Sequence, residues 1–259
     1  MKATSMSPRS GQRTAGGNAV VLLHGHQLDR NLARAVTAEA AGTFVLVLAI
    51  TSAAVAVALS RPVAGAPYGS LAVPVAGGLA LATGVASVGH ISGAHLNPAV
   101  TLGLAVTRHF PWAYAPGYVI AQFTGAIAAA AVTWGLYGDQ ARSIARLGAT
   151  VPAAGVSVGR VVTAEAVVTF VLVLVVVAVA TDSRVPRGIA AMAIGAALAV
   201  AIVIAGPVSG AGVNPARAIA PMILAGQFSD WWAYLAAPLA GGVVAVALCD
   251  MFLRAGDSG

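Results

Sequence analysis

Two stretches of this chain share the frame S-G-A-x-x-N-P-A, one over residues 92–99 and the other over residues 209–216. Asn is a preferred N-cap, and Pro is favoured at the first helical position because its missing N–H would be unpaired there anyway. Each tripeptide therefore predicts the start of a helix, with the Asn oxygen engaged in capping and amide N–H groups available to a neutral solute. The tripeptides are Asn97-Pro98-Ala99 and Asn214-Pro215-Ala216.

Arg217 follows the second Asn by three residues and has no acidic residue close by in sequence. A charged side chain inside a membrane is costly unless it faces water or a partner, so an intramembrane arginine indicates a functional site. The alternative, an arginine that extends from a helix end to the lipid headgroups, fits less well because Arg217 stands near the start of a short helix.

Glu39 and Glu165 occupy matching places within apolar runs. A proton relay built on them would suit an ion-coupled transporter. Alternatively, each carboxylate accepts backbone N–H bonds from the Gly-rich segments before the tripeptides. We favour the second interpretation, because those segments leave buried donors that need partners.

His90 and His95 flank the first Gly-rich segment, but the chain supplies no further ligands at a spacing that would hold a metal. We expect both to brace the loop by hydrogen bonds, with His95 near the cytoplasmic vestibule, and we expect His24, His26 and His109 to be solvated. The sequence predicts no metal and no cofactor. No H-E-x-x-H, G-x-S-x-G or paired catalytic carboxylates appear, so we do not expect an enzyme.

The composition indicates a membrane protein. The chain has 259 residues, of which 59% are hydrophobic and 8% charged, whereas about 25% charged residues are usual in soluble domains. The net charge of +6 comes from scattered basic residues rather than from a patch, so the partner that we expect is the lipid bilayer and not a nucleic acid.

Six apolar runs are long enough to cross roughly 30 Å of hydrocarbon, which takes about 20 residues. They cover residues 36–59, 71–90, 112–137, 160–181, 187–206 and 231–254. Two shorter apolar segments, 97–107 and 214–225, begin at the tripeptides and cannot span. We predict a disordered cytoplasmic tail over residues 1–33, a channel-like domain over 34–254 and a short C-terminal tail over 255–259.

The basic residues predict which side of the membrane holds the termini. On the side of the tail we place Lys2, Arg9, Arg13, Arg30, Arg34, Arg108, Arg184, Arg187 and Arg254, and on the other side Arg61, Arg142, Arg146 and Arg160. Lys and Arg accumulate in cytoplasmic loops, so both termini are predicted to be cytoplasmic, in the cell membrane.

The two halves of the chain are similar in sequence. The stretch AEAAGTFVLVLAI at 38–50 matches AEAVVTFVLVLVV at 164–176, and each is followed by two spans and one tripeptide segment. The repeats cover about 34–137 and 160–254, with three crossings each, so the second enters the membrane from the opposite face. The two short helices then point their N-termini at one another, and two positive dipole ends disfavour a cation between them.

The pair GHISGAHLNPAVT and GPVSGAGVNPAR, with YVIAQ at 118–122 and a glutamate in the first and fourth spans, resembles the major intrinsic protein (aquaporin) family. The resemblance covers about residues 34–254. It implies an all-α membrane fold of six spanning helices and two re-entrant half-helices, a channel for small neutral solutes, and a homotetramer.

The resemblance also implies a narrow selectivity ring, located by counting from the tripeptides without gaps. Its members are Gly77, Ile202, Ala211 and Arg217, and a slip of one residue would place Ala76 or Gly78 at the first position. Water-selective members have an aromatic residue and a histidine in this ring. Glycerol channels have two aromatic residues, with an aspartate after the arginine, where this chain has Ala218.

Small ring residues predict a wide constriction with one apolar wall at Ile202. The ring most resembles that of nodulin-like intrinsic proteins and their bacterial relatives, so we expect passage of glycerol and of arsenous or boric acid, with or without water. A water-selective aquaporin is the alternative. A secondary transporter is less favoured, because no coupling site is evident.

Overall fold

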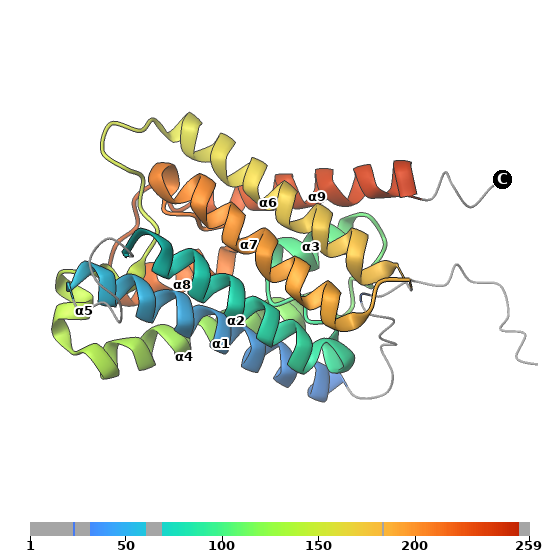
Figure 1. Ribbon diagram of the computed structural model, residues 1–259, viewed down its shortest axis with the longest axis horizontal. Helices are drawn as coiled ribbons and strands as arrows, with labels where there is room; N and C mark the ends of the chain where they lie inside the picture. The colour runs from blue at the N-terminus through green and yellow to red at the C-terminus, as the bar shows by residue number, and fades with distance from the viewer. Residues whose placement is uncertain (1–22, 24–31, 61–68, 183, 254–259) are drawn as a thin grey trace, which may run out of the picture.

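The computed structural model describes residues 23, 32–60, 69–182 and 184–253, and that part of the chain is helical without strands. Six helices are long and apolar enough to cross a membrane (Figure 1). They are α1 (Leu32–Ala58), α2 (Gly69–Ser92), α4 (Ala115–Tyr137), α6 (Val158–Thr181), α7 (Arg187–Ser209) and α9 (Ala233–Leu253). The predicted fold class and number of spans are confirmed.

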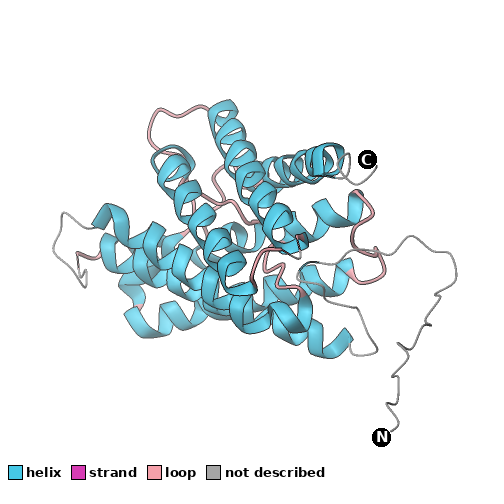
Figure 2. Ribbon diagram, turned by 45° about the vertical axis from the view of Figure 1, so that its right-hand side comes forward, coloured by secondary structure: helices cyan, strands magenta, loops and turns pink. Residues whose placement is uncertain are grey.

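Two further helices begin at the tripeptides and are too short to cross: α3 (Pro98–Val106) has 9 residues and α8 (Pro215–Ala225) has 11. At about 1.5 Å per residue each covers roughly half of the hydrocarbon thickness. The segments that precede them are drawn as loops in the interior of the helical assembly (Figure 2). Non-helical backbone is tolerated at this depth only where protein or a wet cavity surrounds it.

The halves interlock rather than lie side by side as separate units. Within each half the first and third spanning helices pack extensively, α1 against α4 and α6 against α9, while α2 packs against α7 across the repeat boundary. The half-helices cross over: α3 contacts α9 more than α4, and α8 contacts α4 more than α9. Each tripeptide is therefore held by both halves.

Glycines allow the close crossings. A Cβ on Gly125 would overlap the carbonyl oxygen of Ala40, and a Cβ on Gly241 would overlap that of Ala166, at equivalent places in the two repeats. Small residues let helix backbones approach in a membrane, where van der Waals packing replaces the hydrophobic effect as the main attraction between helices.

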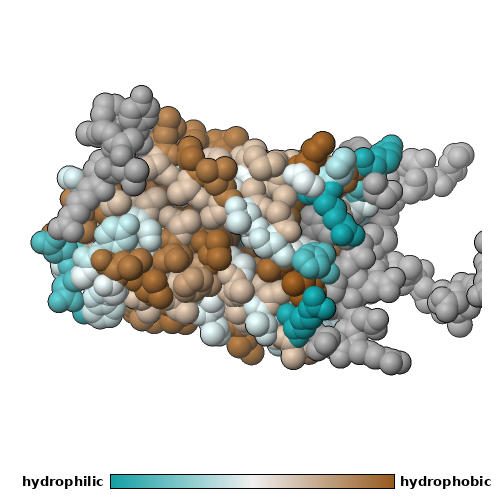
Figure 3. Space-filling view, turned by 60° about the horizontal axis from the view of Figure 1, so that its bottom comes forward, coloured by the Kyte–Doolittle hydropathy of each residue, from teal (hydrophilic) through white to brown (hydrophobic). Residues whose placement is uncertain are grey.

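The surface pattern agrees with a membrane-spanning protein. Apolar residues cover the middle of the face in Figure 3, and hydrophilic residues gather toward its two ends. Exposed large hydrophobic side chains occur on all six spanning helices, for example Leu79 on α2, Ile120 on α4 and Val203 on α7. Such side chains would be costly in water but not in lipid.

Some boundaries differ from the sequence prediction. Helix α2 continues to Ser92 instead of 90, and α7 continues through Pro207 to Ser209 instead of ending at 206. Pro207 has no N–H to donate within α7, and two residues later the Ser209 hydroxyl donates to the Ala205 carbonyl at 3.2 Å. The connection predicted over 138–159 contains a short helix, α5 (Asp139–Ser143), and a 3₁₀ turn, η3 (Arg146–Gly148).

Most of the predicted tails, 1–33 and 255–259, lies outside the described residues. The exceptions in the first tail are Leu32 and Ala33, which begin α1, and Leu23. Leu23 is 1% exposed and belongs to the main apolar cluster, whereas the sequence analysis placed it in the tail.

Candidate functional site

The two half-helices begin as local sequence chemistry requires. The Asn97 side-chain oxygen accepts the Ala99 N–H at 2.8 Å. The Asn214 oxygen accepts the N–H groups of Ala216 at 3.0 Å and Arg217 at 3.3 Å. Each Asn has extended backbone angles and a Pro follows it, so the cap satisfies donors that the helix itself leaves unpaired.

The same two amides tie the halves together. The Asn97 Nδ2 donates to the Val213 carbonyl at 3.1 Å, and the Asn214 Nδ2 donates to the Leu96 carbonyl at 2.7 Å. Each Asn thus reaches the residue that precedes the other Asn. This reciprocal contact places the N-termini of α3 and α8 against each other, and it leaves one N–H on each amide for other partners.

Strained backbone leads into both caps. Ala94 and Leu96 have φ of 48° and 52°, and the equivalent Ala211 and Val213 have 53° and 58°. Left-handed backbone costs an L-residue roughly 1–2 kcal/mol, and a β-branched valine there is unusual. Strain at the same two positions of both repeats indicates that the surrounding structure enforces it.

Two buried carboxylates hold much of this strained backbone in place by hydrogen bonds. Glu39 accepts the N–H groups of His95 at 2.9 Å and Leu96 at 2.7 Å. Glu165 accepts those of Gly212 at 2.8 Å and Val213 at 2.7 Å. Both glutamates are fully buried, and charge-assisted bonds of this kind are about twice as strong as neutral ones.

Four further residues complete the support, and the sequence analysis gave none of them a role. Ser92 donates to Glu39 at 2.7 Å and Ser209 donates to Glu165 at 2.6 Å. Tyr118 donates to the Ser92 carbonyl at 2.8 Å, and Tyr234 donates to the Ser209 carbonyl at 2.6 Å. A signal for the tyrosines exists, because the frame Y-x-x-A-x-x-x-G occurs at 118–125 and again at 234–241.

The support of the segment before α3 includes side chains that have no counterpart at the segment before α8. Gln122 Nε2 donates to Glu39 at 2.8 Å and to the Thr101 hydroxyl at 3.0 Å. The ring of His95 lies 3.1 Å from Thr101 through Nδ1 and packs against Tyr118. The place equivalent to Gln122 in the second half is Pro238, so the two loops are not braced identically.

His90 and His109 do not lie where the sequence analysis expected. His90 is exposed on the last turn of α2 and makes no hydrogen bond within the described part of the chain, so it does not brace the loop there. His109 was expected in solvent but is 8% exposed, with Nε2 at 2.9 Å from the Asp250 carboxylate and Nδ1 at 3.0 Å from the Thr107 hydroxyl. The pair joins the end of α3 to the end of α9, a contact that no local pattern indicates.

Arg217 is buried and lines the same cavity as His95. Its Nη1 donates to the Gly148 carbonyl at 3.1 Å, while its Nε–H has no acceptor among the described residues. Gly148 has a φ of 66°, and a Cβ there would lie 3.0 Å from Ala54, so glycine suits this close turn against α1. The guanidinium is held in place on one edge and can donate to a passing oxygen on another.

A narrow cavity runs between the half-helices, and three of the four predicted ring residues line it: Ile202, Ala211 and Arg217. Gly77 lies beside one of them, because a Cβ on it would be 2.9 Å from the Ile202 Cδ1 atom. A Cβ on the neighbouring Gly78 would instead meet the Gly195 carbonyl oxygen of α7, at 2.8 Å. Of the predicted ring, three residues thus line the cavity and Gly77 lies beside one of them, Ile202.

Ile50 on α1 is a ring neighbour that the sequence analysis missed. It lines the cavity, and its Cγ1 atom would lie 3.1 Å from a Cβ on Gly77. The space that Gly77 leaves is thus partly filled by Ile50 and Ile202. Aliphatic side chains rather than aromatic rings therefore border the cavity beside Gly77.

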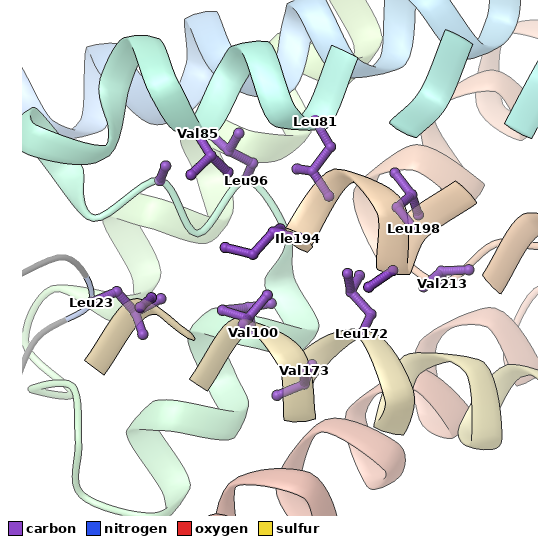
Figure 4. Packing of buried hydrophobic residues seen from close by; sticks show 14 of the residues in the cluster. Leu23, Leu81, Val85, Leu96, Val100, Leu172, Val173, Ile194, Leu198 and Val213 are labelled. Atoms are coloured by element: carbon purple, nitrogen blue, oxygen red, sulfur yellow. The ribbon is translucent and has the colours of Figure 1, made fainter. Parts of the chain in front are cut away.

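The remaining cavity wall is mostly apolar, and the labelled side chains Leu81, Val100, Leu172, Ile194 and Leu198 surround the path in Figure 4. The polar side chains on the path are those of His95, Asn97, Asn214 and Arg217. Among the described residues no cluster of His, Cys, Asp or Glu could hold a metal. The site is equipped to bind by donated hydrogen bonds.

Known proteins are similar to this chain over most of its length. The family model described as "Major intrinsic protein" matches residues 27–249. Aquaporin NIP3-1 of Oryza sativa subsp. japonica is 40% identical over 217 residues, which are 83% of this chain and 67% of the relative. Aquaporin NIP1-3 of the same organism is 41% identical over 82% of this chain and 71% of its own length. Among solved structures, the X-ray structure of the aquaglyceroporin from Plasmodium falciparum has a TM-score of 0.78 at 25% identity, covering 88% of this chain and all of that one.

Proposed function

Because the chain belongs to the major intrinsic protein family, which includes the aquaporins, we propose that it is a passive channel for small uncharged solutes wider than water. The observation that carries the proposal is the wall near Arg217: Ile202 and Ala211 line the same cavity, Gly77 lies beside Ile202, and none of these residues is aromatic. Aliphatic side chains change rotamer more readily than packed aromatic rings move, so this constriction can admit solutes that a rigid ring excludes.

The electrostatics exclude ions. The positive ends of α3 and α8 meet at Asn97 and Asn214, and each carries roughly half an elementary charge. The Arg217 guanidinium adds a full positive charge on the same path. Barriers of this kind are described for aquaporin-type pores, and they disfavour hydronium and metal cations while neutral solutes accept hydrogen bonds from the same groups.

The cavity combines hydrogen-bond donors with apolar side chains, and this combination favours small solutes that carry several hydroxyl groups. Arg217 brings guanidinium N–H donors to the cavity, while Ile50 and Ile202 give it an apolar lining. Glycerol, boric acid and arsenous acid have this shape and carry no charge near neutral pH. The name aquaglyceroporin of the similar solved structure supports the same class. A water-selective channel is the alternative.

A coupled transporter is not favoured by the contacts. Glu39 accepts four hydrogen bonds and Glu165 three, all from loop or side-chain donors of the protein. Neither carboxylate lines the cavity. A proton carried by either glutamate would break the bonds that hold the strained loops, so the groups act as supports rather than as a relay.

We further propose a plasma-membrane location with both termini cytoplasmic, and a homotetramer with one pore per subunit. The excess of Lys and Arg on the side of the termini supports the orientation. Family membership supports the tetramer.

Passive transport is tested with purified protein in liposomes. Glycerol and boric acid fluxes are followed by light scattering after an osmotic jump, with and without ionophores that collapse the proton and sodium gradients. We expect fluxes above those of empty liposomes that do not depend on the ionophores. A flux that disappears when the gradients collapse would indicate a coupled transporter.

A further inference from the structure

The connector between the two repeats contains a strained turn. Arg146, Leu147 and Gly148 have φ of 50°, 52° and 66°, so three consecutive residues are left-handed. An L-residue adopts this conformation singly rather than in runs, because its Cβ then approaches the following carbonyl oxygen. Such strain persists only where the surrounding structure fixes the backbone, and it is frequent at functional sites. The contacts of the turn therefore indicate what it serves.

The turn carries a partner of the arginine that lines the cavity. The Gly148 carbonyl, at the end of the turn, accepts a hydrogen bond from Arg217 Nη1 at 3.1 Å. The position of this carbonyl therefore bears directly on where the guanidinium lies in the path. An arginine side chain has several rotatable bonds, each with about three staggered wells. The carbonyl favours those wells in which Nη1 reaches it.

Leu147 anchors the turn through its buried side chain. It is 0% exposed and forms an apolar cluster with Val55 of α1 and Ala141 of α5. Leu224, in the last turn of α8, packs against the same cluster. Leu147 is not one of the described residues that line the cavity, so its side chain acts on the path through its neighbours. The burial of Leu147 thus holds the Gly148 carbonyl in place.

The connector also contacts the far end of α8. Arg142 Nε donates to the Leu224 carbonyl at 3.0 Å, and the Arg142 guanidinium lies 5.0 Å from the centre of the Trp134 ring. Leu224 belongs to the last turn of α8, where carbonyl groups lack partners within the helix. The connector therefore contacts α8 at both ends, through Arg217 near its start and Leu224 near its end.

We propose that Leu147 is a positioning residue for Arg217. Its burial holds the Gly148 carbonyl, and that carbonyl keeps the guanidinium where it leaves the path open to glycerol. The inference rests on the channel function proposed above. Without the anchor the turn relaxes, the carbonyl moves, and the Arg217 side chain spreads over rotamers that cross the path. If about one well in three leaves the path open, at one or two torsions, glycerol permeability falls by about three- to tenfold.

The test compares glycerol and water permeability of full-length variants in proteoliposomes. Leu147→Ala should lower the glycerol-to-water permeability ratio by about three- to tenfold, because water needs less width than glycerol. The ratio does not depend on how much of the variant folds. Leu147→Met keeps an apolar side chain of similar volume and should keep the parent ratio. Ile144→Ala is the matched control, because Ile144 lies in the same connector but is 60% exposed, and it should also keep the parent ratio.

A double-mutant cycle separates positioning from a general loosening of the protein. In the Arg217→Val background there is no guanidinium to position, so Leu147→Ala should leave the glycerol-to-water ratio unchanged. An equal fall of the ratio in both backgrounds would show that Leu147 acts on the path without Arg217, and it would overturn the proposal. A parent-like ratio in Leu147→Ala alone would overturn it as well.

The outcomes also separate this role from the channel function. If the parent protein passes water but not glycerol, the proposed solute class fails, and water permeability per folded channel decides the role of Leu147. Leu147→Ala should then lower it in the parent protein and not in the Arg217→Val background, and any other result excludes the positioning role. If no form conducts any solute, the channel function fails and the positioning role with it.

Discussion

Replacing Gly77 by alanine changes the constriction by one methyl group at a known place. The new Cβ would lie 2.9 Å from Ile202 Cδ1 and 3.1 Å from Ile50 Cγ1, whereas carbon atoms in contact are about 3.5–4.0 Å apart. The Ile202 methyl must therefore move by roughly 0.6–1 Å. Both isoleucines line the cavity, so the shifted methyl group makes the cavity narrower at this point.

The size of the effect follows from the cost of overpacking. If glycerol must push the displaced methyl group aside again as it passes, a strain of about 1–3 kcal/mol is added to its barrier. Glycerol permeability should then fall by about 5- to 150-fold, while water permeability falls much less because water needs less width. Ile202→Val in the alanine background removes the displaced methyl and should restore most of the glycerol flux.

The assay is light scattering on proteoliposomes with equal protein content, for water and for glycerol. Gly135→Ala is the matched control, because a Cβ on this glycine of α4 meets no atom within 4 Å. If Gly77→Ala leaves the glycerol-to-water ratio unchanged, or if Ile202→Val does not rescue it, then Gly77 does not border the constriction and the ring assignment is refuted.

Three other variants test the supports and the charge barrier. Glu165→Gln weakens the acceptors of two loop N–H groups and should lower the free energy of unfolding by about 2–4 kcal/mol. The melting temperature in detergent should then fall by about 5–15 °C. An unchanged melting temperature would contradict the bracing role. Gly241→Ala places a Cβ on the Ala166 carbonyl oxygen, so folded protein should be largely lost on size-exclusion chromatography, and recovery at the parent level would show that α6 and α9 can separate. Arg217→Val installs the residue found at the equivalent Val100, and it should raise proton leakage measured with an entrapped pH-sensitive dye; parent-level leakage would assign proton exclusion to the half-helices alone.

The caps and the half-helices can be predicted from the sequence, because residues that are neighbours along the chain determine them. Asn followed by Pro specifies a helix start, and a 9-residue helix after a Gly-rich segment cannot span a bilayer. The orientation of the second half follows from counting crossings. The position of Gly77 follows from a fixed distance to Asn97 along a helix that continues without a gap to Ser92.

Other contacts of the site depend on which faces of the helices pack together. A single sequence does not give the packing of one helix face against another. Ile50 borders the ring only because α1 turns that face toward Gly77, and His109 reaches Asp250 across about 140 residues of chain. Leu23 lies in a polar segment whose average composition predicts disorder, and one buried side chain does not change that average. The two tyrosines could have been found from their repeated frame.

The central claim is that this channel passes solutes wider than water through a ring without aromatic side chains. The most direct test measures water, glycerol and boric acid permeability of the protein in proteoliposomes beside Gly77→Phe. The account predicts facilitated glycerol and boric acid flux in the parent protein, and its loss when the phenylalanine fills the space beside Ile50 and Ile202. Rapid water flux without glycerol or boric acid flux in the parent protein would contradict the account and indicate a water-selective channel.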